Sequence, residues 1–168
     1  MELIVSDDHA GLKSARKAVF PAIPWQRCVF HMAQKAQAYV PKKSMREEIA
    51  QSVRDIYNSP TREAALAVKA AVIKNYTSSA LAFCRWLKNN IEEGLTFMNF
   101  PRSCWKKVRT SNVVERVNGE VKRRTRVARL FPNEESCLRL VTAVLQEVHE
   151  MWKSGKKYMT LEDQKNIF

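Results

Sequence analysis

Asp7 is the first residue whose type and position suggest chemistry. It closes the short apolar run Glu2–Ser6, and a helical pattern begins soon afterwards at Ala10. Carboxylates at the ends of strands in α/β sheets commonly face a ligand, and Mg²⁺ prefers carboxylate oxygens together with substrate phosphate. Asp7 is therefore a candidate metal ligand. The alternative is that Asp7 or Asp8 caps the following helix, because Asp is a favoured N-cap residue.

Glu115 is the second candidate, on a helix predicted from Val113 to about Arg126 with Asn112 as its N-cap. Metal-bound phosphodiester chemistry needs an acidic oxygen for the cation and a nearby Lys or Arg for the phosphate. At about 100° per residue, one helix face offers a carboxylate, a gap where backbone can approach a ligand, and two cations: Glu115, Gly119, Lys122 and Arg126.

Two other interpretations of this helix stay open. Asn112 and Glu115 also fit a capping box, in which Glu115 returns a hydrogen bond to the N-cap residue. Glu120 competes with Glu115 as the chemical acid, although it lies about 140° around the helix from Glu115 and nearer the apolar arc. That arc is expected to face the core and consists of Val113, Val114, Val117 and Val121.

Positive charge is concentrated around the same helix. The chain has 29 Lys and Arg against 17 Asp and Glu, a formal charge of +12, which favours a polyanionic partner. Tyr and Phe are sparse in this region, so the pattern predicts salt-dependent contact with nucleic-acid phosphates rather than base stacking. The candidates for phosphate contact are Lys106, Lys107, Arg109, Arg116, Lys122, Arg123, Arg124 and Arg126.

Cys28 and His31 have the spacing of two zinc ligands. A closed structural zinc site needs four ligands, and the remaining Cys and His residues offer no matching second pair. A Cys–His nucleophile would need a third group to orient it, and none is evident. We expect Cys28 to be buried and His31 to lie near the strand end at Asp7.

Two short strands and about seven helices must position these residues. Residues 1–155 are expected to form one domain without a linker, residues 95–109 a loop, and residues 156–168 a polar tail. The strands are predicted at 2–6 and 25–30, and the helices at 10–20, 31–40, 77–93 and 113–126, from Ser44, from Ser59 and after Asn133.

The four cysteines are far apart and form no CxxC pair. Together with the lack of a secretory leader, this predicts reduced thiols in a cytoplasmic protein. No apolar run approaches the roughly 18–20 residues that span a bilayer, so no membrane partner is expected.

Several segments together resemble the Mutator-type transposases of bacterial insertion sequences. The run from Ile4 to Leu12, IVSDDHAGL, is similar to the family's second-Asp motif, with Asp8 where a small residue is common. WQRCVFH at 25–31 resembles a second family segment. TSNVVERVNGE at 110–120, followed by RRTR at 123–126, resembles a third, and FPNE at 131–134 also fits. The resemblance covers essentially the whole chain.

The resemblance implies an α/β, RNase H-like core with a DDE triad that cleaves and transfers DNA strands. Two Mg²⁺ or Mn²⁺ ions would activate water or a DNA 3′-hydroxyl. Asp7 matches the second acidic ligand and Glu115 the third. Lys122 matches a basic residue that contacts DNA. Cys28 and His31 match an element with a structural or supportive role at the site. The partners implied are the insertion-sequence ends and target DNA, bound by a homodimer, with the protein associated with the nucleoid.

The chain departs from the family pattern because no residue matches the first Asp, which lies upstream of the second. We therefore expect the C-terminal part of a catalytic domain: an incomplete core with two short strands, a helical insertion at about 41–100, and little activity alone. Loss of one carboxylate should weaken ion binding. The exposed strand edge favours self-association. The alternatives are a non-catalytic DNA-binding remnant and a zinc-stabilised module built on Cys28 and His31.

Overall fold

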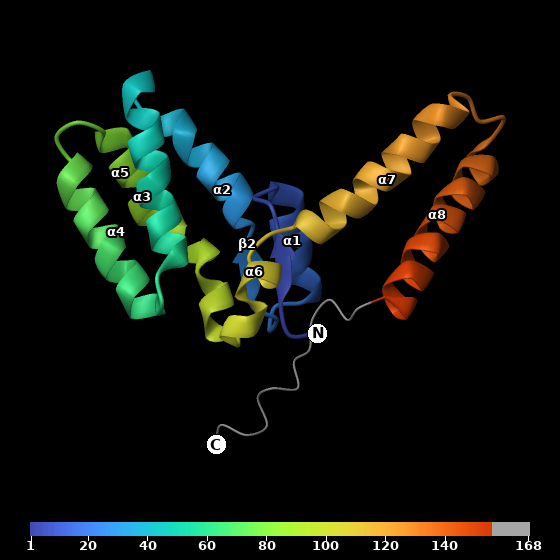
Figure 1. Ribbon diagram of the computed structural model, residues 1–168, viewed down its shortest axis with the longest axis horizontal. Coiled ribbons are helices and arrows are strands. Elements are labelled where there is room, and N and C mark those ends of the chain that lie inside the picture. Colours follow the sequence, from blue (N-terminus) through green and yellow to red (C-terminus); the bar gives the residue numbers. More distant parts are fainter. Residues whose placement is uncertain (156–168) are drawn as a thin grey trace, which may run out of the picture. The chain divides into compact units, whose positions relative to one another are not determined.

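A computed structural model describes residues 1–155 of the chain (Figure 1). The chain divides into two compact units, Met1–Thr110 and Ser111–Phe168, and the described part of the second unit ends at residue 155. The polar tail expected at 156–168 lies outside the described residues.

The first unit begins with a pair of parallel strands, β1 (Ile4–Ser6) and β2 (Trp25–Arg27), with Val5 opposite Gln26. Parallel strands need a crossover connection, and helix α1 (Ala10–Val19) supplies it. The second strand is shorter than the predicted 25–30, because Cys28 takes the N-cap position of helix α2 (Val29–Ala36).

A layer of helices follows the strands: α3 (Arg46–Asn58), α4 (Arg62–Tyr76) and α5 (Leu81–Asn90). Figure 1 shows these three helices side by side, and α4 packs against both of the others. The short 3₁₀ helices η1 (Gln37–Tyr39) and η2 (Lys43–Met45) connect α2 to α3.

The core of the first unit lies within this helical layer and beneath α2. Ile49, Phe83 and Leu87 are completely buried there. Val53, Val72 and further apolar residues complete one continuous cluster. On α3, the residues Ile49, Val53 and Ile56 are buried at the helical spacing that predicted this helix.

The stretch predicted as a loop, 95–109, is instead a series of short helical turns, so that prediction was wrong. The turns are the 3₁₀ helices η4 (Thr96–Asn99) and η5 (Arg102–Cys104), followed by α6 (Trp105–Val108), and a further 3₁₀ helix, η3 (Ile91–Gly94), precedes them. The Phe97 and Trp105 rings pack edge to face, 5.3 Å between centroids, and Trp105 Nε1 donates to the Phe100 carbonyl over 2.7 Å. Burial of these aromatics overrides the weak local periodicity.

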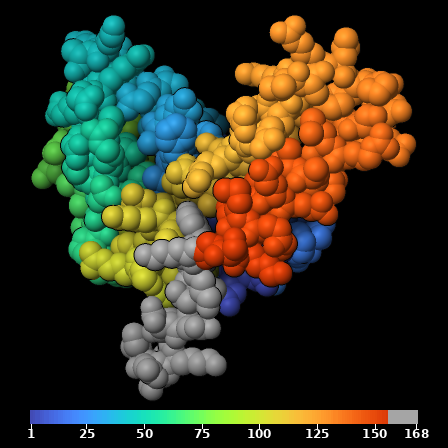
Figure 2. Space-filling model, turned by 45° about the vertical axis from the view of Figure 1, so that its right-hand side comes forward, coloured from blue at the N-terminus to red at the C-terminus, as the bar shows by residue number. Residues whose placement is uncertain are grey.

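The second unit is a helical hairpin of α7 (Asn112–Ala128) and α8 (Glu134–Ser154), whose side chains meet in Figure 2. Arg129 ends α7 with φ 56°, in the left-handed region. Helix α8 begins directly after Asn133, as predicted, and Asn133 caps it, because its side chain accepts a hydrogen bond from the Ser136 N–H over 2.8 Å. The prediction of a mostly helical chain with two short strands is therefore confirmed.

Candidate active site and nucleic-acid surface

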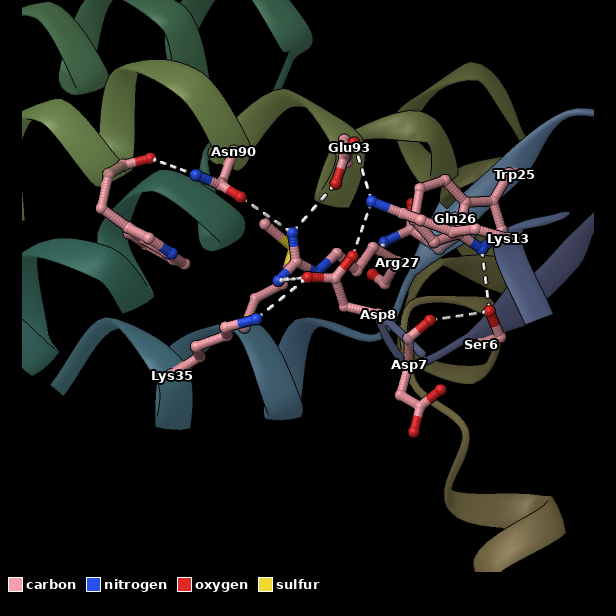
Figure 3. A network of polar contacts seen from close by, with 12 residues as sticks. Ser6, Asp7, Asp8, Lys13, Trp25, Gln26, Arg27, Lys35, Asn90 and Glu93 are labelled. Atoms are coloured by element: carbon pink, nitrogen blue, oxygen red, sulfur yellow. Dashed lines mark hydrogen bonds and ion pairs between the residues drawn. The ribbon is translucent and has the colours of Figure 1, made fainter. Parts of the chain in front are cut away.

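The two adjacent acids at the end of β1 have different surroundings (Figure 3). Asp8 is held by three cations: Lys13 at 2.6 Å, Arg27 at 2.7 Å and Lys35 at 3.1 Å. Partial burial raises the pKa of Asp8, but hydrogen bonds from Lys13 and Lys35 and the nearby positive charges outweigh it, so this pKa lies below its ordinary value. Asp8 is thus a fully engaged structural anion.

Arg27 is the centre of this network and is almost completely buried. Its guanidinium also binds Glu93 at 2.9 Å and Asn90 at 3.0 Å. Because Asn90 ends α5 and Glu93 lies in η3, the network ties the strand ends to the helical layer. A buried guanidinium needs this many partners to offset the loss of its hydration.

Asp7 points away from the network and is only half-buried (Figure 3). Its Oδ1 accepts a hydrogen bond from the His9 N–H at 3.3 Å. The N-cap position of α1 belongs to His9, which makes no side-chain capping bond. Neither Asp7 nor Asp8 therefore occupies the N-cap position, which the capping interpretation had assigned to one of them.

The strand end is held firmly behind Asp7. Trp25 Nε1 donates to Ser6 Oγ over 2.9 Å, and Ser6 Oγ donates to the Asp7 carbonyl over 2.9 Å. Lys13 and Arg16 also stack on the Trp25 ring. These contacts fix the backbone that presents the Asp7 carboxylate.

A surface pocket of about 380 Å³ opens beside this strand end, entirely within the first unit. The pocket brings the Asp7 carboxylate, which lies outside the network around Arg27, together with imidazoles and cations. Such a combination suits the binding of a metal ion and a phosphate together. Its lining residues are Asp7, Asp8, His9, Arg27, His31, Gln34 and Lys35.

The Cys28–His31 element lies at the start of α2, next to this pocket. Cys28 is completely buried, as expected, and His31 reaches the pocket lining. One ligand atom from each lies within 4.8 Å of the other. Within residues 1–110, no group of three or more Cys, His, Asp or Glu side chains lies close enough to share an ion. The four cysteines form no disulfide.

In the second unit, α7 presents the face predicted from its sequence. Glu115, Gly119, Lys122 and Arg126 are all exposed, and Ser111 Oγ donates to Glu115 Oε1 over 2.6 Å. Ser111, not Asn112, occupies the N-cap position, and it makes no side-chain capping bond. The capping box of Asn112 and Glu115 was therefore wrong, because the helix begins one residue earlier than its sequence pattern indicated.

The apolar arc of α7 is shallower than predicted. Val113, Val117 and Val121 are half-buried, but Val114 is 58% exposed, so its assignment to the core was wrong. Val114 lies about 60° around the helix from Val117, outside the strip that a single neighbouring helix can cover.

Glu120 is a structural anion, like Asp8. Arg123 binds it through two nitrogens and Arg124 through one. The hydrogen bond from Arg123, followed by that from Arg124, lowers the pKa of Glu120 to about 2. Arg124 also reaches Glu147 of α8 at 3.2 Å, which ties the hairpin together.

The eight candidate phosphate contacts fall into three groups. Arg109 binds Asn58 Oδ1 at 3.1 Å, and Arg123 and Arg124 bind Glu120, so these three have structural partners. Lys107 is half-buried. The remaining four are exposed and form no ion pair in the described part of the chain: Lys106, Arg116, Lys122 and Arg126.

The sequence patterns did not indicate four residues that line the pocket together with Asp7: His9, Arg27, Gln34 and Lys35. A signal for Lys35 was present, because positions i and i+4 of a helix share a face and Lys35 follows His31 by four residues. Nothing comparable marked Arg27, since arginine is rarely buried.

Residues 1–155 match the sequence profile of the Mutator family of transposases, and the chain belongs to that family. It is 44% identical over 157 residues to the transposase for insertion sequence element IS406 of Burkholderia multivorans, covering 94% of this chain and 40% of that protein. It is 39% identical to the ISRM5 transposase of Rhizobium meliloti, covering 97% and 41%. It is 38% identical to the IS1081 transposase of Mycobacterium tuberculosis, covering 95% and 38%.

The chain thus spans about two fifths of the length of these relatives. In the described residues, no helix combines the length and the apolar character needed to cross a lipid bilayer.

Proposed function

We propose that this chain carries two acidic residues of a DDE transposase centre, Asp7 and Glu115, which act in metal-dependent cleavage and transfer of DNA strands. The single observation that carries the proposal is the contrast between Asp7 and Asp8. Three cations already neutralise Asp8, whereas the Asp7 carboxylate points away from them at the end of a strand. The family supports the DNA chemistry.

The donor set fits a hard divalent cation such as Mg²⁺ or Mn²⁺, because both ligands are carboxylates. Such an ion would supply positive charge at the attacked phosphate. The chain's own groups would do the rest: Asp7 and Glu115 hold the ion, and Lys35 and His31 place positive or hydrogen-bonding groups beside the substrate phosphate. Cys28, at the N-cap position of α2, supports the first turn of the helix from which His31 projects.

We further propose that β1 and β2 belong to an RNase H-like sheet, with Asp7 at the carboxyl end of its strand and the helices α3 to α5 forming the insertion. Because Asp7 and Glu115 supply two carboxylates where the family pattern has three, the chain alone should have little activity. A homodimer on paired DNA ends, located at the nucleoid, is part of the same proposal.

The test is nicking and strand transfer on a supercoiled plasmid, with Mg²⁺ or Mn²⁺ and with a chelator. Asp7→Asn and Glu115→Gln should each abolish any metal-dependent product. Matched controls are Asp55→Asn on α3 and Glu150→Gln on α8, both exposed, which should leave it unchanged. Product that survives both active-site changes would contradict the assignment.

A second readout covers the case of a chain too slow to assay. Mn²⁺ binding, followed by electron paramagnetic resonance, should weaken at least tenfold in Asp7→Asn and stay unchanged in Asp55→Asn. Equal Mn²⁺ affinity in the two variants would remove Asp7 from the metal site.

Non-catalytic DNA binding is a second candidate, favoured by the exposed cations of α7 that have no ion pair in the described residues. Each phosphate contact contributes about 0.9 to the slope of binding affinity against salt concentration. Arg116→Gln, Lys122→Gln and Arg126→Gln should each lower that slope by about one, whereas Arg123→Gln, already paired with Glu120, should lower it less. Unchanged slopes would remove α7 from the DNA surface.

A further inference from the structure

Helices α7 and α8 enclose a groove of about 590 Å³ that lies within the second unit. Small-molecule sites usually have volumes of about 300–1,000 Å³, so the groove is large enough for a ligand. On α7 its lining includes Arg116 and Gly119, which are three positions apart and share a helix face. On α8 its lining includes Val148, Met151 and Trp152, which share a face in the same way. The groove is therefore formed by the facing sides of the two helices.

The α8 side of the groove exposes large apolar side chains. Trp152 is 55% and Met151 64% exposed, and the half-buried Val117 and Val148 line the same groove. An indole ring that is exposed in a concave site is available to stack on another planar ring. The sequence around α7 predicted phosphate contact without base stacking, because Tyr and Phe are sparse there. Trp152 supplies an aromatic ring from the neighbouring helix.

The charged residues of the groove leave one cation available for an anion. Glu120 is bound by Arg123 and Arg124, and Arg124 also binds Glu147, so these four side chains neutralise one another. Arg116 is the remaining charged residue of the lining. It is exposed and forms no ion pair among the residues that the structure describes. The net positive charge of the lining is therefore located at Arg116.

Gly119 leaves the α7 side of the groove open. A Cβ at this position would meet no atom of the described residues within 4 Å, so backbone rather than a side chain faces a ligand there. Gly119 lies about 40° around α7 from Glu115 and about 6 Å along the helix axis. Stacked nucleotides repeat about every 3.4 Å along a strand. A DNA strand whose phosphate lies at Glu115 would therefore reach the groove, across Gly119, within one or two nucleotides.

We propose that this groove binds one unpaired base of a DNA strand, with the base stacked on Trp152 and its phosphate bound by Arg116. The bases of an intact duplex already stack on one another, whereas an unpaired base has a free face. An apolar peptide is a poorer match, because half of the lining residues are charged. The inference rests on DNA as the substrate, as proposed above, but it does not depend on the metal site.

The experiment compares two DNA ligands that differ only in their bases. Each is a duplex with a short single-stranded 3′ end, and in one of the two this end is abasic, so both present the same phosphates. Binding of the full chain is measured by fluorescence anisotropy in the presence of a chelator, which prevents any contribution from a bound metal ion. The base analogue 2-aminopurine, placed in the single-stranded end, reports stacking directly through the quenching of its fluorescence.

Substitutions at four positions locate the base. Trp152→Ala removes the ring, and Trp152→Phe keeps an aromatic face. Gly119→Leu fills the groove from the α7 side, and Arg116→Gln removes the phosphate contact. Leu138→Ala is the matched control, because Leu138 is 56% exposed on the same helix and does not line the groove. All four positions are exposed, so the hairpin should fold, and circular dichroism checks this.

The unchanged chain should bind the end that carries bases at least about fivefold more tightly than the abasic end, because stacking of a base on an aromatic side chain contributes that much or more. Trp152→Ala and Gly119→Leu should abolish the difference. Trp152→Phe should keep most of it, and Leu138→Ala all of it. Arg116→Gln should weaken the binding of both ligands alike, since both carry the phosphate.

Three outcomes would contradict the proposal in different ways. Equal binding of the two ends by the unchanged chain, or a difference that survives Trp152→Ala, would overturn the base site alone and leave the proposed DNA chemistry of Asp7 and Glu115 standing. No binding of either end would overturn DNA as the substrate together with the base site. Free deoxyadenosine monophosphate that competes at the concentrations at which the DNA binds would overturn the proposal in favour of a free nucleotide.

Discussion

The two units of this chain are built on different principles. The first has a core of its own, in which Ile49, Phe83 and Leu87 are fully buried. In the described part of the second, only Val144 is buried, while Val127 is 77% and Leu130 88% exposed. The first unit therefore carries its stability internally, and the hairpin depends on α7–α8 contacts and surface ion pairs. The exposed cations and the candidate acid Glu115 are therefore carried by a helical hairpin that itself buries little apolar surface.

The two units have similar arrangements of acidic residues. Each holds one carboxylate with arginine, Asp8 in the first unit and Glu120 in the second. Each also has a second carboxylate, Asp7 at the end of β1 and Glu115 on the exposed face of α7. The difference is depth: Arg27 is buried around Asp8, whereas Arg123 is exposed beside Glu120.

The largest predicted effect is a loss of stability, and it differs between a buried residue of the first unit and one of the second. Phe83→Ala should lower the free energy of unfolding by about 4 kcal/mol, because it removes a fully buried ring and leaves a cavity. Val144→Ala removes fewer atoms from a thinner interface and should cost about 2 kcal/mol. Urea denaturation followed by tryptophan fluorescence measures both. Equal losses would mean that the hairpin has a core as deep as that of the first unit.

The next effect compares the buried Arg27 of the first unit with Arg124 of the second. Arg27→Met should destabilise the chain by about 3 kcal/mol, because it leaves Asp8 and Glu93 without their buried counter-charge. Arg124→Met breaks exposed pairs to Glu120 and Glu147 and should cost less than about 1 kcal/mol. The same urea titration applies. A larger loss for Arg124→Met would reverse the comparison.

A smaller effect tests how closely the first unit is packed. A Cβ at Gly94 would lie 2.7 Å from both Met32 Sδ and the Tyr57 hydroxyl, so Gly94→Ala should cost about 2 kcal/mol through overpacking. A Cβ at Gly119 on α7 meets nothing within 4 Å, and alanine favours helices. Gly119→Ala should therefore stabilise the hairpin slightly. Thermal melts distinguish the two signs, and destabilisation by Gly119→Ala would show that α7 is covered.

The smallest effect is a pH dependence in acid. Asp8 and Glu120 both have pKa values below those of the unfolded chain, Glu120 at about 2. Their stabilising contribution is present above the unfolded pKa of about 4 and is lost as pH falls through the folded value. Melting temperature should thus fall between about pH 4.5 and 2. The fall should be smaller in Asp8→Asn and Glu120→Gln. If the dependence of melting temperature on pH were unchanged in both variants, other carboxylates would account for most of the loss of stability in acid.

The sequence predicted those features that depend on local pattern. The strand that leads to Asp7, the extent of α7 and the start of α8 after Asn133 follow from apolar spacing, and each is present. The missed features depend on distant contacts. The turns at 95–109 form because Phe97 and Trp105 pack together. Arg27 is buried because Asp8, Asn90 and Glu93, up to 66 residues away in the chain, surround it. Neither arrangement has a local signature.

Glu92 and Glu93 are neighbours in η3, yet they bind cations from different layers. Glu92 binds Lys69 of α4 at 2.6 Å, and Glu93 binds Arg27 of β2 at 2.9 Å. An inserted or deleted residue at this point would shift the helices relative to the strands, and it would break either the Glu92–Lys69 or the Glu93–Arg27 ion pair. Residues added between α3 and α4, at 59–61, would leave both intact. Length variation among descendants of this chain should therefore accumulate in the loops between the helices, and η3 should keep its length.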